Sequence, residues 1–271
     1  MTITREPKFY EPATTTVQRV GRQVLILWES VGRAAIMAGL AFLDFRYIFS
    51  RRNRHEVFYQ MFVTGIRSLG VLTVVALFTG MIFALQTGIE LARYGQEVNV
   101  GGAVTVVMLR EMGPFMAGMI LTASVGSSIG AQLGTMTVSE EIAALEIMSI
   151  DPIRFLVMPR LVAFTVMLPL CTFYTDIIAV LGGGLVGYTQ LGIPPYLYYD
   201  NALLYAETKD LWIGVLKAFV FGVIICTTAC YKGFTTTGGA VGVGKATRDT
   251  VVVSFLLTLI VGYIITKLFY A

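Results

Sequence analysis

Five long apolar stretches follow one another after residue 67, and they constrain the fold of this chain more than any other feature. They run from about Leu69 to Leu91, Val100 to Met136, Leu161 to Leu191, Leu211 to Tyr231 and Thr250 to Tyr270. A helix needs roughly 20 predominantly apolar residues to cross the hydrocarbon core of a bilayer. Only 14% of the residues are charged, against about 25% in soluble domains. The sequence therefore predicts an all-α membrane protein with five transmembrane helices.

The distribution of Lys and Arg predicts how these helices are oriented. Ten of them precede the first span, and the connections after the second and fourth spans add five more. The other side has only Arg93, Lys209 and Lys267. Because cytoplasmic loops carry the excess of positive charge, we expect the N-terminus in the cytoplasm and the C-terminus outside. The outer loop holds Tyr196, Tyr198, Tyr199, Tyr205 and Trp212. Such a cluster is typical of an interfacial aromatic belt.

The segment before the spans divides into two parts. Residues 1–16 are polar and have neither the apolar core nor the cleavage site of a signal peptide. From Val17 to Ala38 the apolar residues follow helical spacing, with a basic opposite face and Trp28 on the apolar side. This pattern predicts a helix that lies in the membrane interface; a soluble helix packed on a domain is the alternative. We expect residues 17–66 to form this elbow helix and a basic linker, and residues 67–271 the five-span domain.

The second span carries an Arg, a Glu and a Pro close together, at Arg110, Glu111 and Pro114. An ionisable residue at the centre of a membrane helix costs at least about 2.5–3.5 kcal/mol, so both charges should face protein or water. Adjacent helical residues point about 100° apart, so the two cannot simply neutralise each other. Each needs another partner from a neighbouring helix, a second subunit or a charged ligand. Pro114 should kink the helix beside them. The pattern indicates a polar site or a structural network of ion pairs.

Small residues recur at every fourth position further along the second span. They are Gly118, Thr122, Gly126, Gly130 and Gly134, and Gly183 and Gly187 repeat the spacing in the third span. Small residues at this spacing let another backbone approach closely. We expect a packing surface rather than a ligand site, and two copies of the chain could meet there.

Two further charges lie within the later spans. Asp176 of the third span could pair with Arg110 or with Lys217 of the fourth span. Lys217 is close enough to Trp212 for its amine to reach the membrane surface, and this is the preferred interpretation for the lysine.

The connection between the second and third spans has the pattern of a short amphipathic helix, at about residues 137–150. Thr137 and Glu140 have the spacing of a capping box, and Asp151-Pro152 should end the helix. Its apolar stripe is Ile142, Leu145 and Met148, with Glu140, Glu141 and Glu146 at the edges. Such a helix could rest on the membrane or dock into a groove on a cytoplasmic partner.

Several function classes are not supported. Residues 239–246 approach a phosphate-binding loop, but Ala246 replaces the Ser or Thr that would hold Mg²⁺, and we expect a flexible turn instead. His55 is the only histidine, and neither a zinc-protease nor a Gly-x-Ser-x-Gly motif occurs. Three cysteines inside apolar runs predict neither disulfides nor a metal site. A net charge of +3 is too small to indicate nucleic acid. We therefore predict no catalytic residues, no metal and no cofactor.

Several separated motifs resemble one known family. They are Leu109-Arg110-Glu111-Met112-Gly113-Pro114, Glu140-Glu141-Ile142, Ile150-Asp151-Pro152, Pro159-Arg160, Gly182-Gly183-Gly184, and the stretch from Tyr231-Lys232-Gly233 to Lys245-Ala246-Thr247-Arg248. In this order they resemble the MlaE/YrbE family of ABC transporter permeases, over nearly all of the chain from Val17 onward.

The resemblance implies a machine of several subunits. Members of the family are homodimeric proteins of the bacterial inner membrane with an interfacial helix and five spans. They pair with a cytoplasmic ABC ATPase that binds the ATP, often with a STAS-domain protein, and with a periplasmic MCE-domain protein. The complex moves phospholipids, or steroids and other lipids in some relatives, between the inner membrane and the outer envelope. The alternative from another class is a membrane scaffold that recruits a cytoplasmic partner without transport.

The resemblance also implies roles for particular residues. Arg110, Glu111 and Met112 should border the lipid cavity, together with Phe83, Leu91 and Tyr94 at the outer end of the first span. Arg248, at the start of the fifth span, matches a family arginine and joins the substrate-binding set. The helix at about residues 137–150 looks like the coupling helix that contacts the ATPase, through Glu140, Glu141, Ile142, Leu145 and Met148.

Overall fold

The computed structural model describes residues 25, 29, 31–41 and 51–270. This part of the chain is built of helices and turns, without strands. Five of its helical segments are long and apolar enough to cross a membrane: Arg54–Ala92, Glu97–Val138, Ile153–Thr189, Thr208–Phe234 and Gly239–Tyr270. The predicted five spans are therefore confirmed, and each is longer than its apolar pattern indicates. The predicted orientation in the membrane stays a prediction.

The first span begins earlier than its apolar stretch. It consists of α2 (Arg51–Thr64), the 3₁₀ turn η2 (Ile66–Ser68) and α3 (Leu69–Ala92). The segment assigned to the basic linker is thus helical from Arg51 and leads directly into the span. Gly65 at the junction has no Cβ, and an added one would lie 1.9 Å from the Met167 methyl group. The glycine lets this junction lie close against the third span.

The second span is a continuous helical segment interrupted by two wider turns. It consists of η3 (Glu97–Asn99), α4 (Val100–Val107), the π-helical η4 (Met108–Met112), α5 (Gly113–Leu121), the π-helical η5 (Thr122–Gly126) and α6 (Ser127–Val138). The disruption expected at Pro114 takes the form of the π turn η4, which ends just before the proline. Because Pro114 has no N–H, the Arg110 carbonyl lacks the donor that a regular α-helix would give it.

The remaining elements are the third span, a short helix, the fourth span and the fifth span, in this order. They are η6 (Ile153–Val157), α8 (Met158–Thr189), α9 (Pro195–Tyr205), α10 (Thr208–Phe234) and α11 (Gly239–Tyr270). Residues 239–246 are the first two turns of α11, so the flexible turn expected there is wrong. Gly238 and Gly239, with φ of 89° and 67°, supply the reversal before the helix.

The short helix α7 (Glu141–Ile147) is smaller than expected, and its cap differs. Thr137 remains in α6, where its hydroxyl donates to the carbonyls of Leu133 at 2.8 Å and Gly233 at 3.0 Å. Glu140 has a φ of 61° and turns the chain between the two helices. The predicted capping box is therefore wrong. The Asp151 carboxylate accepts the N–H of Ile153 at 2.9 Å, so it begins the third span instead of ending α7.

Part of the predicted elbow helix lies within the described residues. Residues 31–41 are helical and apolar. Met37, Ala38 and Ala41 are buried, whereas Val31 and Ala35 of the predicted apolar face are exposed. The polar segment 1–16, the helix over residues 17–24 and the connection at 42–50 lie outside the described residues.

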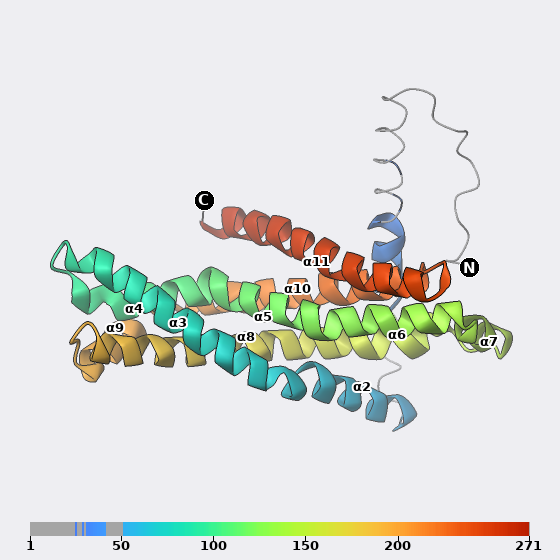
Figure 1. Ribbon diagram of the computed structural model, residues 1–271, viewed down its shortest axis with the longest axis horizontal. Coiled ribbons are helices and arrows are strands. Elements are labelled where there is room, and N and C mark those ends of the chain that lie inside the picture. Colours follow the sequence, from blue (N-terminus) through green and yellow to red (C-terminus); the bar gives the residue numbers. More distant parts are fainter. Residues whose placement is uncertain (1–24, 26–28, 30, 42–50, 271) are drawn as a thin grey trace.

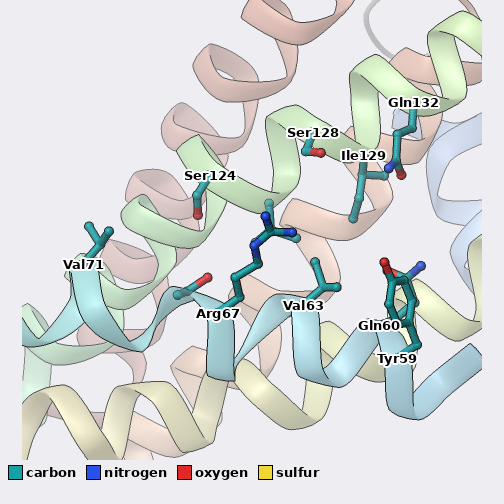
Figure 2. Close-up of a pocket in the computed structure, with 11 residues that line it drawn as sticks. Tyr59, Gln60, Val63, Arg67, Val71, Ser124, Ser128, Ile129 and Gln132 are labelled. Atoms are coloured by element: carbon teal, nitrogen blue, oxygen red, sulfur yellow. The ribbon is translucent and has the colours of Figure 1, made fainter.

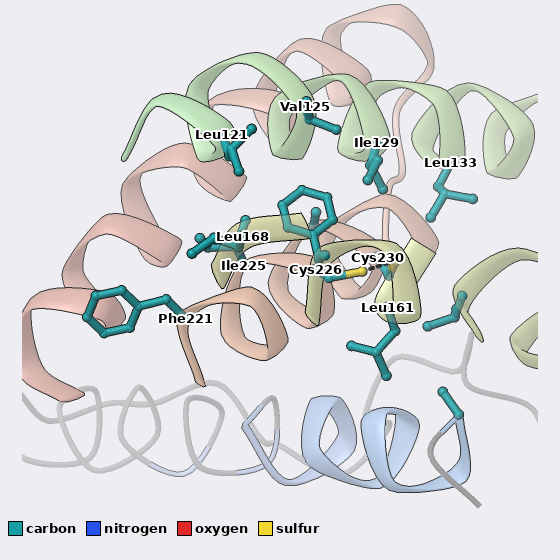
Figure 3. Close-up of a cluster of buried hydrophobic side chains, with 14 of the residues drawn as sticks. Leu121, Val125, Ile129, Leu133, Leu161, Leu168, Phe221, Ile225, Cys226 and Cys230 are labelled. Carbon is teal, nitrogen blue, oxygen red and sulfur yellow. Dashed lines mark hydrogen bonds between the residues drawn. The ribbon is translucent and has the colours of Figure 1, made fainter. Parts of the chain in front are cut away.

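The larger hydrophobic core lies between the second, third and fourth spans. Leu121, Val125, Ile129 and Leu133 line one face of the second span, from the end of α5 through η5 and α6 (Figure 3). They pack toward side chains of α8 and α10, including Leu168 and Ile225. Cys171, Cys226 and Cys230 are free thiols buried in this core, as their apolar surroundings indicate.

The stripe of small residues in the second span is occupied by helices of the same chain. A Cβ added to Gly130 would lie 2.8 Å from the hydroxyl oxygen of Thr250 in α11. One added to Gly134 would lie 3.0 Å from the hydroxyl oxygen of Thr236, just after α10. The stripe is confirmed as a packing surface. The expectation that two copies meet there is wrong, because α10 and α11 already cover it.

The helices α9 and α7 lie at opposite ends of the molecule (Figure 1). Tyr198 of α9 is fully buried against the third span, where an added Cβ on Gly183 would lie 2.4 Å from its hydroxyl. Tyr198 is therefore a core residue instead of part of an aromatic belt. Tyr196 and Trp212 are 70% and 68% exposed and stay available to a membrane interface.

Candidate functional site

The two charges of the second span have separate partners on the fourth span. The Arg110 Nε lies 2.8 Å from Oδ2 of Asp210, and the Glu111 Oε1 lies 2.6 Å from Nζ of Lys217. Both partners belong to α10. The expectation that Arg110 and Glu111 do not neutralise each other is confirmed. Of the three sources of partners left open, a neighbouring helix supplies both counter-charges.

The pair of Arg110 and Asp210 is completed by the last residue of α11. The Tyr270 hydroxyl donates to Oδ1 of Asp210 at 2.5 Å, and the Arg110 guanidinium lies 4.6 Å from the centre of the Tyr270 ring. The Asp210 side chain is fully buried, whereas that of Arg110 is 35% exposed. The terminal nitrogens of Arg110 have no acceptor among the described residues. They can therefore donate to an anion without breaking the ion pair.

Lys217 is the most constrained charge of the site. Its ammonium group donates to the Arg110 carbonyl at 2.7 Å, to Oε1 of Glu111 at 2.6 Å and to the Thr266 hydroxyl at 2.7 Å. Its side chain is only 1% exposed, so the interpretation that it reaches the membrane surface is wrong. The carbonyl of Arg110 is free because Pro114 has no N–H to donate, and Lys217 replaces that donor.

Close packing of α10 against the π turn holds these groups in place. A Cβ added to Gly214 would lie 2.4 Å from the carbonyl oxygen of Leu109 in η4. Gly214 lies between Asp210 and Lys217 on α10, so the closest approach of the two helices is at the level of the ion pairs. Because the attraction between two charges increases as they come closer, this close approach strengthens both ion pairs and is part of the site.

Asp176 does not pair with either predicted partner. It is 5% exposed and packs beside Gly113, where an added Cβ would lie 1.8 Å from its Oδ1. That oxygen has no hydrogen-bond partner among the residues the structure describes. The expected pairs with Arg110 and Lys217 are therefore wrong. Asp210 of α10 is the acid that pairs with Arg110, which is the role proposed for Asp176.

The apolar residues assigned to the cavity divide into two groups. Phe83, Leu91 and Met112 are partly buried and pack on one cluster shared by α3, α4, α8 and α9. Tyr94 lies in the turn after α3 and is 77% exposed. The structure therefore places three of these residues around one cluster beside the charged turn, and the fourth in the exposed turn that follows α3.

Arg248 lies far from the other predicted substrate-binding residues. It is an exposed residue of α11, 22 residues before Tyr270. At 1.5 Å per residue, this spacing is about 33 Å along the helix. Tyr270, at the end of α11, contacts the guanidinium of Arg110. Arg248, near the start of α11, therefore lies far from Arg110, toward the other end of the helix bundle.

The predicted coupling residues also divide into two groups. Ile142 is 6% exposed and Leu145 is partly buried, and both pack on the main core of the chain. Glu140, Glu141 and Met148 are exposed. The most exposed apolar side chain of α7 is Ile147, at 85%, which the sequence pattern did not single out. A partner that docks on α7 would therefore meet the exposed side chains Glu141, Ile147 and Met148.

Asp210, Thr266 and Tyr270 are members of the site that the sequence pattern missed. Asp210 and Lys217 are seven residues apart, so they lie on the same face of α10 two turns apart. This spacing is a usable signal. Tyr270 and Thr266 are four residues apart at the end of an apolar helix, where nothing in the pattern distinguishes them from packing residues.

The site as a whole is electrically balanced, with two cations and two carboxylates. Lys217 and Asp210 are buried and ion-paired, whereas Arg110 and Glu111 keep 35% and 40% of their side chains exposed. The buried charges hold the exposed ones in position. The arrangement can bind an anionic group at Arg110, next to an apolar cluster.

Comparison with known proteins gives one consistent family. Residues 57–268 match the family model described as Permease MlaE. A Rickettsia prowazekii protein named a probable ABC transporter permease is 40% identical over 78% of this chain and 82% of its own length. The chloroplastic protein TRIGALACTOSYLDIACYLGLYCEROL 1 of Arabidopsis thaliana is 31% identical, over 90% of this chain and 69% of its length.

A third relative carries the family name itself. The intermembrane phospholipid transport system permease protein MlaE of Haemophilus influenzae is 28% identical, over 94% of this chain and 97% of its own length. The family model alone covers more than half of the chain and extends into all five spans. This multi-pass membrane protein therefore belongs to the MlaE family of ABC transporter permeases.

Proposed function

We propose that this chain is the permease of a lipid transporter and that Arg110 binds the phosphate of the lipid headgroup. The observation that carries the proposal is the geometry of Arg110. Its Nε is paired with Asp210, its face lies on the Tyr270 ring, and its terminal nitrogens stay free. A guanidinium held in this way is suited to a phosphate, which accepts charge-assisted hydrogen bonds from planar donors.

The surroundings of Arg110 suit the rest of a lipid. Met108 and Met112, each two residues from Arg110 in the sequence, belong to or pack on the apolar cluster that also contacts Phe83 and Leu91. A diacyl lipid needs both an apolar environment for its chains and a charge for its headgroup. The Haemophilus influenzae relative is named for intermembrane phospholipid transport, which supports a phospholipid as the substrate. A steroid or another lipid is the alternative within the same family.

The energy for transport would come from a separate subunit. The lookalike of a phosphate-binding loop is the start of α11, and its Ala246 is buried instead of offering a hydroxyl. We therefore assign ATP binding and hydrolysis to a partner ATPase and no catalysis to this chain. The ATPase would dock on the exposed side of α7, with Glu141, Ile147 and Met148 at the contact.

The other features of the assembly follow from the family. We propose a homodimer in the bacterial inner membrane, with α7 on the cytoplasmic side and α9 outside. A periplasmic MCE-domain protein would meet the α9 end, and a STAS-domain protein would accompany the ATPase. The positive charges near α7, among them Arg154 and Arg160, support this orientation.

The test is ATP-dependent phospholipid transfer by the reconstituted complex. Arg110→Ala should abolish transfer, but alone it also leaves Asp210 buried without its counter-charge. The decisive variant is Arg110→Gln with Asp210→Asn, which removes both charges together. We expect this double variant to assemble with the ATPase and to lose transfer, whereas Asp210→Asn alone keeps a measurable rate.

Two outcomes would contradict the proposal. Normal transfer by the double variant would remove Arg110 from the lipid path. A complex that co-purifies with an ATPase whose turnover does not respond to lipid would favour the alternative, a scaffold that recruits a partner through α7 without transport.

A further inference from the structure

A groove separate from Arg110 lies between the first and second spans. It combines two cavities of about 420 and 570 Å³ that share the lining residues Tyr59, Gln60, Ser128 and Gln132. One wall is formed by α2 and the start of α3, and the other by η5 and α6 (Figure 2). Ser124 lies 14 residues after Arg110 in the second span, which corresponds to about 20 Å along a helix. The groove is therefore a distinct place in the molecule.

Arg67 supplies a charge to this groove. Figure 2 shows its side chain extending from the first span toward the helix that carries Ser124 and Ser128. Arg67 is exposed and has no ion pair or hydrogen bond with any described residue. It belongs to the helical segment Arg54–Ala92, two residues before the apolar stretch that begins at Leu69. A guanidinium without a counter-charge in the chain can donate charge-assisted hydrogen bonds to an anion, so the groove has an unused affinity for negative charge.

The other end of the groove is also cationic. Arg160 is 8% exposed and donates to the Leu156 carbonyl at 2.6 Å, with its other terminal nitrogen 3.5 Å from Oε1 of Gln132. Its buried Nε has no hydrogen-bond partner among the described residues. The one acid of the groove, Glu56, accepts a hydrogen bond from Gln60 at 2.9 Å. Two guanidinium groups against one carboxylate leave a net positive charge.

An exposed apolar stripe leads away from Arg67 along α3. Its members are Val71, Val74, Phe78 and Ile82, each between 56% and 64% exposed. They follow Arg67 at intervals of four, three, four and four residues, so all lie on one face of the helix. A ligand with an anionic head at Arg67 would therefore find an apolar track for its chain. Inorganic phosphate would make no use of this stripe.

We infer that this groove binds the phosphate of a membrane lipid laterally, with the headgroup at Arg67 and an acyl chain along α3. The inference rests on the proposed function, because it gives a lipid permease a second lipid site nearer the α7 end. The hydroxyl and amide groups of Ser124, Ser128 and Gln132 would complete the headgroup contacts. Free phosphate shares the chemistry of the headgroup, and the experiment separates the two.

The test is photo-crosslinking in a detergent without phosphate. Tyr59, which lines both cavities and is 54% exposed, is replaced by the aromatic photo-crosslinker benzoylphenylalanine. The probes are alkyne-tagged phosphatidic acid and a diacylglycerol with the same chains. We expect capture of the phosphatidic acid to be about tenfold stronger or more, as for a lost hydrogen bond to a charged group.

Matched variants assign the capture to Arg67. Arg67→Gln should lower phosphatidic acid capture to the level of the diacylglycerol, whereas Arg67→Lys should keep part of it. Arg54→Gln removes an exposed charge of the same span that does not line the groove, so it should leave capture unchanged. Ser128→Leu fills the groove without touching a charge, and it should also block capture if Arg67→Gln does not fold.

The outcomes separate this site from the proposed function. The double variant with Arg110→Gln and Asp210→Asn should still capture lipid at the groove. The inference can therefore be supported even if this variant has lost lipid transfer. Equal capture of both probes, full competition by millimolar inorganic phosphate, or crosslinking to a second copy of the chain would each overturn it. So would loss of capture in the variant at Arg110 and Asp210.

Discussion

At the scale of single residues, the second span was predicted to need outside partners for its charges, and it has them. The reason was geometric, because neighbours on a helix cannot face each other. The identity of the partners was not predictable, since Asp176 and Asp210 are both acids in or near apolar helices. Only the fold shows that Asp210 meets Arg110 while Asp176 packs beside Gly113.

Replacing Lys217 by Met should destabilise the protein. The substitution leaves the Glu111 carboxylate and the freed Arg110 carbonyl without their common donor. Breaking a buried pair costs about 3–5 kcal/mol, and we expect the lower end because Glu111 is 40% exposed. The measurement is chemical unfolding in detergent.

Two controls accompany this variant. Lys267→Met removes an exposed lysine of α11 and should change stability by no more than about 0.5 kcal/mol. Adding Glu111→Gln to Lys217→Met should restore part of the loss. If Lys217→Met and Lys267→Met unfold alike, the contacts described for Lys217 do not stabilise the protein.

At the scale of elements, the helices were predictable and their close contacts were not. Hydropathy predicts the spans because a helix needs about 20 apolar residues to cross the hydrocarbon core of the membrane. The π turn at η4 was foreseeable only as a disruption by Pro114. The interaction of the small-residue stripe with α10 and α11, instead of a second copy, depends on the packing of all five spans.

Gly80 and Gly70 of α3 give a direct test of close helix packing. An added Cβ on Gly80 would lie 1.9 Å from the Ala179 carbonyl oxygen of α8, whereas one on Gly70 would meet nothing within 4 Å. We expect Gly80→Ala to cost about 1–3 kcal/mol through overpacking. Gly70→Ala should be neutral or stabilise by up to about 1 kcal/mol, because Ala favours the helix. Equal effects in an unfolding titration would contradict the described contact of α3 and α8.

At the scale of the whole molecule, the two ends have different features. The end with α9 holds Arg110, its balanced partners and an apolar cluster, and the end with α7 holds exposed side chains for a partner. The fold class and the number of spans follow from the sequence alone. Of the predicted substrate-binding residues, Arg110, Glu111 and Met112 lie together because they adjoin in sequence. Arg248 lies apart, because a match to a family motif does not show how far apart two residues are in the folded chain.

The lipid retained by the purified complex tests the central claim most directly. Mass spectrometry is applied to the protein with Arg67→Gln, so that the groove no longer selects a phosphate-bearing lipid and such a lipid, if retained, belongs to the site at Arg110. The account predicts a phosphate-bearing lipid in a fixed ratio to protein, and its loss when Arg110→Gln and Asp210→Asn are added. Retention of the same lipid in the same amount by that variant would contradict the account.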